Sequence, residues 1–137
     1  MEVHPYLSFP GNCEEALNFY AKCLGGKVEN LSRFADSPME AQVGPENSQK
    51  VMHARVRAGG LTIMASDDMR PGANAKSEGN FSLSLAAKSE GEAKRVFEAL
   101  AEGGSVDMPF ADAFWGGKFG MLTDKYGVCW MMSVGGE

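Results

Sequence analysis

The sequence contains two histidines, and each lies on a short segment in which polar and apolar residues alternate. His4 and Tyr6 lie within residues 2–9, whereas His53 and Arg55 lie within residues 51–58. Alternate side chains of a strand share a face, so we expect these side chains on the cavity-facing side of strands. An imidazole can transfer a proton or contact a ligand, and a guanidinium can bind an oxyanion through two hydrogen bonds. The alternative is that they are ordinary strand residues, partly buried or exposed.

A second candidate group is the aromatic and methionine side chains in and near residues 111–132, the stretch that holds both tryptophans. Phe114, Trp115 and Phe119 could line an apolar pocket together with Met64 and Met131, because methionine adapts to irregular ligand shapes. Packing of the sheet, or of an interface between subunits, explains the same residue types equally well.

Smaller features of the same stretch have simpler interpretations. Gly116 and Gly117 predict a tight bend after the first tryptophan. Residues 118–122 and 128–132 flank a polar turn and predict a hairpin, in which Asp124 is a turn-forming residue. Cys129 is a candidate reactive thiol, although a buried and inert cysteine is the alternative.

Composition excludes several classes of function. The 137 residues suffice for one buried core, and the net charge is −5. Because phosphate binding needs concentrated basic residues and the chain has no such cluster, we expect no nucleic-acid partner. No apolar segment approaches the roughly 20 residues that span a bilayer, so we expect no membrane partner and a cytoplasmic location. Three widely spaced cysteines suit free thiols in a reducing compartment.

Periodicity and turn residues predict the order of elements. Strands are expected at 2–9, 27–34, 51–58, 61–66 and 81–87, with helices starting after Asn12 and over 88–102. Residues 35–49 are expected to form a loop without fixed secondary structure, and the polar segment 67–79 a linker. The glycine pairs that end the two helices, at 25–26 and 103–104, lie 78 residues apart. The same offset relates other positions, which predicts tandem βαβββ modules within a single domain. Module 1 covers about 1–68, the linker 69–79, and module 2 about 80–137.

Several motifs extend over nearly the whole chain: PYLSF, GNCEEALNFY, HARV, SDDMRPG, FWGGKFG and DKYGVCWM. Together they resemble the PhnB-like branch of the glyoxalase/bleomycin-resistance (vicinal oxygen chelate) superfamily, also labelled 3-demethylubiquinone methyltransferase-like. The resemblance implies an α+β fold of two βαβββ modules, forming a curved mixed sheet around a cavity, with helices on the convex face and commonly a homodimer. The methyltransferase label finds no support in the residues, because no strand is followed by a glycine-rich loop and helix suited to S-adenosylmethionine.

The resemblance also implies where a metal would be held in metal-dependent relatives. Carried over strand by strand, those positions are His4, Met64, Ser82 and Met131. Only the histidine is an ordinary ligand, because a thioether is too soft for the divalent ions of such sites. We therefore expect no metal and no other cofactor. The alternative is a metal-dependent lyase, isomerase or dioxygenase that uses His4 as a ligand, with His53 as a second weak donor.

Together with what the resemblance implies, the sequence favours a homodimeric protein that binds a small organic molecule in a cavity. A partner-binding dimer without a closed cavity is a third possibility. The expected ligand-binding residues come from both modules: His4, Tyr6, His53, Arg55, Met64, Phe114, Trp115 and Met131.

Overall fold

The computed structural model describes residues 1–70 and 80–135. It divides into two compact units, Met1–Ala75 and Lys76–Glu137, each of which is described by itself. Most of the predicted linker, at residues 71–79, lies outside the described residues. Among the described residues, no helix is both long and apolar enough to cross a bilayer.

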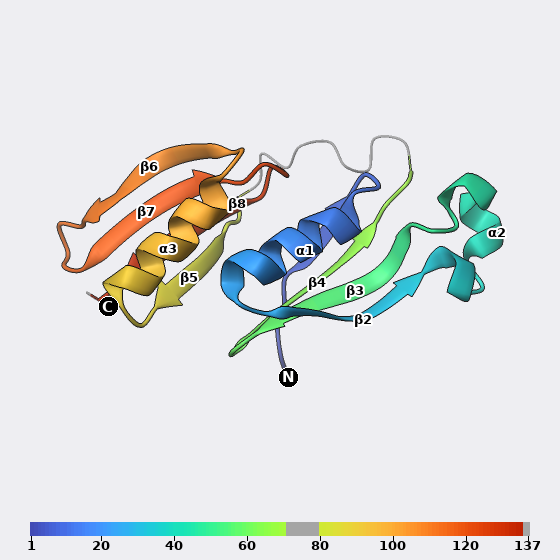
Figure 1. The fold of residues 1–137 in the computed structure, drawn as a ribbon, viewed down its shortest axis with the longest axis horizontal. Helices are drawn as coiled ribbons and strands as arrows, with labels where there is room; N and C mark the ends of the chain where they lie inside the picture. Colours follow the sequence, from blue (N-terminus) through green and yellow to red (C-terminus); the bar gives the residue numbers. More distant parts are fainter. Residues whose placement is uncertain (71–79, 136–137) are drawn as a thin grey trace. The chain divides into compact units, whose positions relative to one another are not determined.

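Unit 1 is a four-stranded mixed sheet with one long helix on one face (Figure 1). Its sheet has the order β1-β4-β3-β2, in which β1 runs parallel to β4 and the other neighbours are antiparallel. The bounds of its main elements, in chain order, are β1 Tyr6–Phe9, α1 Cys13–Leu24, β2 Lys27–Arg33, β3 Val51–Ala58 and β4 Leu61–Asp67.

The core of unit 1 lies between α1 and the sheet. Leu17 and Tyr20 of α1 are fully buried, as are Ala54, Val56 and Ala65 of β3 and β4. The helix therefore covers the face of the sheet that carries the apolar residues of each alternating strand, as the sequence predicts. Apart from Asp67 at the end of β4, the polar residues of these two strands lie on the face opposite α1.

The start of α1 is held by Asp67. Its Oδ1 accepts hydrogen bonds from the backbone N–H groups of Gly11 (3.0 Å) and Cys13 (2.9 Å), and its Oδ2 accepts one from Val51 (2.9 Å). Asn12 occupies the N-cap position but forms no side-chain cap, and its Oδ1 is buried without a partner in the described structure. The polar segment expected at 67–79 starts too early, because Asp67 ends β4 and is 4% exposed; this residue falls within the bounds of about 1–68 expected for module 1.

The prediction of a loop without fixed secondary structure at residues 35–49 was also wrong. This segment contains α2 (Glu40–Val43) and two 3-10 helices, Phe34–Asp36 and Pro45–Asn47. Local side-chain hydrogen bonds stabilise these turns: Ser37 Oγ accepts one from Met39 N–H, and the Asn47 amide donates one to the Val43 carbonyl. Short polar residues form such bonds readily, and apolar periodicity does not reveal them.

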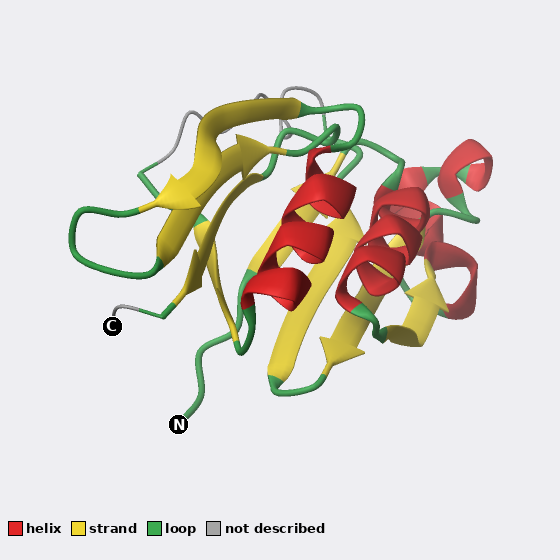
Figure 2. Ribbon diagram, turned by 60° about the vertical axis from the view of Figure 1, so that its left-hand side comes forward, coloured by secondary structure: helices red, strands yellow, loops and turns green. Residues whose placement is uncertain are grey.

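Unit 2 repeats the architecture of unit 1, with one helix packed on one face of a four-stranded sheet (Figure 2). The sheet order is β5-β8-β7-β6, with β5 parallel to β8 and the other pairs antiparallel. The bounds of its elements are β5 Leu83–Ala87, α3 Glu90–Ala101, β6 Ser105–Asp112, β7 Lys118–Thr123 and β8 Cys129–Val134.

The helix and hairpin of unit 2 agree with the prediction. Ser89 is the N-cap of α3, and its hydroxyl accepts a hydrogen bond from the Glu92 N–H at 3.2 Å. The carboxylate of Glu92 in turn accepts a hydrogen bond from Lys88 N–H, so two backbone N–H groups at the helix start have side-chain acceptors. Strand β6 had no predicted bounds, because it is exposed along most of its length and contains Pro109.

The two glycine pairs have equivalent roles in the two units. Gly25 and Gly103 adopt left-handed φ values of 70° and 77°, which L side chains rarely adopt. The second glycine of each pair lies against a strand: a Cβ at Gly26 would collide with the Arg57 carbonyl, and one at Gly104 with the Thr123 carbonyl. The offset of 78 residues in the sequence therefore corresponds to a repeated helix-to-strand connection.

Candidate functional site

Three of the predicted ligand-binding residues form a row across the sheet of unit 1, on the face opposite α1. In the strand register, Met64 of β4 lies between Tyr6 of β1 and Arg55 of β3, and Arg55 also pairs with Glu29 of β2. Residues directly opposite on neighbouring strands have Cβ atoms about 5 Å apart. The row therefore brings a phenol, a thioether and a guanidinium–carboxylate pair together on one surface.

His53 joins this row through Tyr6. The Tyr6 hydroxyl lies 3.0 Å from His53 Nδ1, and the two ring centroids are 5.7 Å apart. With the imidazole proton on Nε2, the hydroxyl donates to Nδ1, which leaves Nε2–H available as a donor. Tyr6 is 51% exposed, so a ligand can reach it.

Arg55 retains much of its hydrogen-bonding capacity. Its Nη2 lies 3.5 Å from Glu29 Oε1, and the side chain is about one-third exposed. Its Nε–H is buried and has no acceptor among the described residues. A guanidinium has five N–H donors and binds planar oxyanions through pairs of them. This geometry suits an anionic group on a ligand, with Glu29 as the resident counter-ion.

His4 lies outside this row, ahead of β1, and its Nε2 is 3.2 Å from a Glu2 carboxylate oxygen. Within residues 1–70 and 80–135, no group of three or more His, Cys, Asp or Glu side chains could hold a metal ion. The register pairs Met64 with Tyr6 and Met131 with Ser84. The positions carried over as His4 and Ser82 therefore lie two residues before the residues that face the two methionines.

The other predicted ligand-binding residues lie in unit 2. Phe114 and Trp115 lie in the β6–β7 loop, with ring centroids 4.9 Å apart, and the Trp115 ring is 5.5 Å from that of Phe119. Met131 pairs with Met121 in the register of β8 and β7, and Met121 pairs with Met108. Their convergence with the unit 1 row on one cavity stays a prediction.

Asp124 and Cys129, two further residues considered in the sequence, also lie in unit 2. Asp124 accepts hydrogen bonds from the N–H groups of Tyr126 (2.8 Å) and Val128 (3.0 Å) and from the Trp130 indole (2.8 Å), as expected of a turn-forming residue. Cys129 is partly buried, with its Sγ 3.7 Å from Thr123 Oγ1.

Cys13 of unit 1 is a buried cysteine at the start of α1. Burial raises the pKa of Cys13 to about 12, and the nearby Asp67 and Glu14 carboxylates add to this shift. Since the thiolate is the reactive form, Cys13 is an inert part of the core at neutral pH.

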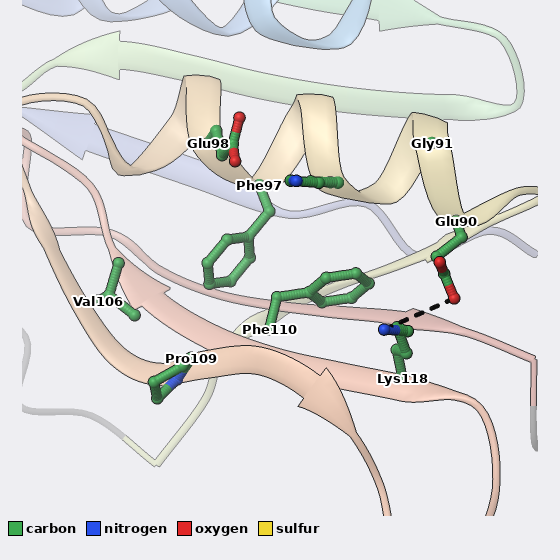
Figure 3. Close-up of a pocket in the computed structure, with 9 residues that line it drawn as sticks. Glu90, Gly91, Phe97, Glu98, Val106, Pro109, Phe110 and Lys118 are labelled. Carbon is green, nitrogen blue, oxygen red and sulfur yellow. Dashed lines mark ion pairs between the residues drawn. The ribbon is translucent and has the colours of Figure 1, made fainter.

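The sequence analysis missed a groove in unit 2, between α3 and the strands β6 and β7 (Figure 3). It has a volume of about 440 Å³. Phe97 and Phe110 extend into it from helix and strand, with ring centroids 5.7 Å apart, and Lys118 at its end lies 3.7 Å from Glu90. The spacing of Glu90, Lys94 and Glu98 places these residues on one side of α3, and this was the signal available in the sequence. Because the sequence predicted no bounds for β6, it did not indicate the strand that forms the other wall of the groove.

Comparison with known proteins adds the evolutionary context. The model of a family described as 3-demethylubiquinone-9 3-methyltransferase matches residues 1–133. Protein YjdN of Escherichia coli K12 is 39% identical over 142 residues, which cover 98% of this chain and 95% of YjdN.

Solved structures agree with this match. Protein PA1353 of Pseudomonas aeruginosa is 43% identical with a TM-score of 0.85, covering 98% of this chain and 97% of its own. A PhnB protein of Bacillus cereus is 31% identical with a TM-score of 0.82, covering 98% and 100%. A glyoxalase-related enzyme of Fulvimarina pelagi, at 15% identity, shares the fold with a TM-score of 0.65 over 98% of this chain and 89% of its own. The predicted glyoxalase-like α+β fold is confirmed.

Proposed function

The chain belongs to the family described as 3-demethylubiquinone-9 3-methyltransferase, the PhnB-like branch of the glyoxalase/bleomycin-resistance superfamily. From this premise we propose that it binds a small organic molecule on the face of unit 1 opposite α1. Because this superfamily hosts many chemistries on one scaffold, the proposal rests on the residues of the site rather than on the family.

The observation that carries the proposal is the row Tyr6–Met64–Arg55 with His53 hydrogen-bonded to Tyr6. These four side chains come from three strands, so the pleat of the sheet holds them in place. They combine an apolar surface with a few polar groups at defined positions, which is the usual composition of small-molecule sites. The proposal does not include methyl transfer, since the β1–α1 connection, Pro10–Asn12, contains one glycine and no glycine-rich phosphate loop.

A screen of metabolites by thermal shift, followed by calorimetric titration of each hit, tests the proposal. We expect a hit to raise the melting temperature of the wild-type protein. Arg55→Gln should weaken its binding by about tenfold or more, because a charge-assisted hydrogen bond contributes about 1.5–3 kcal/mol. Arg95→Gln is the matched control, since Arg95 is an exposed residue of α3 in unit 2 and the change removes the same charge without altering any residue of the row. Equal binding by both variants would contradict the assignment of the site.

The metal-dependent alternative is tested with the same protein. Elemental analysis, before and after incubation with nickel, manganese or zinc, measures bound metal per chain. Stoichiometric metal that is lost in His4→Ala would overturn the metal-independent binding function.

A further inference from the structure

We propose that the ligand of this site is a small organic oxyanion with an aromatic or apolar body, recognised by Lys27 and Arg57 together with Arg55. This inference rests on the proposed function and specifies the chemistry of its ligand. The observation that carries it is that two positively charged residues, Lys27 and Arg57, lie opposite each other on the same face as the row of Tyr6, Met64 and Arg55.

Lys27 of β2 lies directly opposite Arg57 of β3 in the strand register. Both residues are exposed. Like charges directly opposite each other on antiparallel strands destabilise a sheet. Throughout residues 1–70 and 80–135, neither side chain has a carboxylate within ion-pair distance, so no resident group compensates this repulsion.

The pair continues the row of candidate residues. Arg57 follows Arg55 by two positions on β3, so both side chains lie on the face opposite α1, about 7 Å apart along the strand. Glu29 is the one carboxylate among the strand residues of this face that the structure describes, and it is next to Arg55. Glu2, ahead of β1, is paired with His4.

The local charge is therefore opposite to that of the whole protein. Three permanent cations face one carboxylate on this surface, although the chain has a net charge of −5. A concentration of one sign of charge attracts ligands of the opposite sign. An anion on this surface would relieve the repulsion between Lys27 and Arg57 and contact the exposed part of the Arg55 side chain.

The uncharged side chains of the row indicate the chemistry of the part of the ligand that carries no charge. Met64 and the half-exposed Tyr6 ring offer an apolar and aromatic surface next to the cations. A thioether contacts aromatic rings favourably, and an aromatic face stacks on a planar ligand. Carboxylates and phosphate esters both carry the negatively charged oxygens that the cations would bind.

Three probes that share a phenyl ring separate these possibilities: benzoate, phenyl phosphate and the neutral benzamide. Each is titrated into the ¹⁵N-labelled full chain, and amide chemical shifts are followed by NMR. We expect benzoate or phenyl phosphate, or both, to shift the amides of β2 and β3 around residues 27–29 and 53–57. Benzamide should shift them at least about tenfold less at the same concentration. The anion-induced shifts should also weaken between 0.1 M and 1 M NaCl, where the Debye length falls from about 10 Å to about 3 Å.

The double variant Lys27→Gln/Arg57→Gln should lose about tenfold in affinity for the anion, whereas Arg95→Gln should retain it. Because both substituted residues are exposed, we expect the fold to survive, and the dispersion of the amide spectrum checks this. Equal shifts with benzamide and benzoate, or anion binding unchanged in the double variant, would overturn the inference and leave the proposed function standing. No shift on this face with any probe, together with no hit in the metabolite screen, would overturn the proposed function itself.

Discussion

Units 1 and 2 pair their strands in the same order, yet the residues at equivalent positions of the two sheets differ in chemistry. Across β1, β4, β3 and β2 the register aligns Tyr6, Met64, Arg55 and Glu29. Across β5, β8, β7 and β6 it aligns Ser84, Met131, Met121 and Met108. One scaffold thus presents a polar, charged row in one unit and a methionine row in the other.

The comparison separates what the fold requires from what a site requires. Features shared by both units, such as the glycine pairs that end α1 and α3, belong to the scaffold. Features found in one unit, such as the cations of β3, are not needed to build a βαβββ module. This distinction gives three predictions, ordered from the largest expected effect to the smallest.

The largest effect is expected at Gly26 and Gly104. An added Cβ would collide with the Arg57 carbonyl in one unit and the Thr123 carbonyl in the other, and backbone atoms cannot move aside cheaply. We expect Gly26→Ala and Gly104→Ala each to lower the free energy of unfolding by about 3 kcal/mol, measured by urea denaturation.

Gly91→Ala is the matched control. A Cβ at this helical position meets no atom within 4 Å, and alanine is the better helix former. This variant should be about 0.5–1 kcal/mol more stable than the wild-type protein. A large loss in only one of the two strand-facing glycine variants would contradict the equivalence of the two units.

The second prediction concerns the buried aspartates. Asp67→Ala would leave three backbone N–H groups of unit 1 without their acceptor, and Asp124→Ala would do the same to two backbone groups and an indole of unit 2. We expect each change to cost about 2–3 kcal/mol, because a buried donor left without a partner costs about 1–3 kcal/mol. Urea denaturation followed by circular dichroism measures the loss.

The positions of the tryptophans allow the same variants to test cooperativity. Both tryptophans lie in unit 2, so their fluorescence reports the unfolding of that unit. In a single cooperative domain, Asp67→Ala lowers the midpoint seen by fluorescence as much as the midpoint seen by circular dichroism. An unchanged fluorescence midpoint would instead show that the two units unfold independently.

The smallest effect is expected at the ion pairs that join each helix to its sheet. Arg33 donates two hydrogen bonds to the Glu14 carboxylate, at 2.9 Å and 3.1 Å, whereas Lys118 reaches Glu90 at 3.7 Å. Both pairs are partly exposed, so we expect Arg33→Gln to cost about 0.5 kcal/mol and Lys118→Gln less. Thermal unfolding at neutral pH measures both.

The Arg33 effect should depend on pH. Hydrogen bonding to Arg33 lowers the pKa of Glu14 below its ordinary value of 4.5 in the folded state. A lowered folded pKa adds stability above the unfolded pKa, and this contribution is lost as the pH falls through the folded pKa. The difference between wild type and Arg33→Gln should therefore be constant from pH 7 to about pH 5 and decrease at lower pH. A difference that grows as the pH falls would contradict this pairing.

Much of the fold could be predicted from local patterns. The alternation of β3, the apolar stripe of α1 and the Ser89 cap of α3 each depend on neighbours within a few residues, so periodicity and capping rules reach them. Strand β6 and the short helices after β2 could not be placed in this way. The former is an exposed edge strand, and the latter depend on side-chain hydrogen bonds that leave no apolar period.

For the candidate site, the sequence by itself determined which face of each strand His53, Arg55 and Met64 occupy, because alternation along a strand is local. Outside the β3–β4 hairpin, whose register its two-residue turn fixes, only the tertiary structure decided which residues lie opposite one another. Strand register paired Met64 with Tyr6 rather than His4, brought Glu29 to Arg55, and set Lys27 against Arg57. It also showed that Asp67, from the end of β4, holds the start of α1. Between segments distant in the chain, such as β1 and β4, register depends on matching the patterns of both partners, and the spacing of residues within one segment does not reveal it.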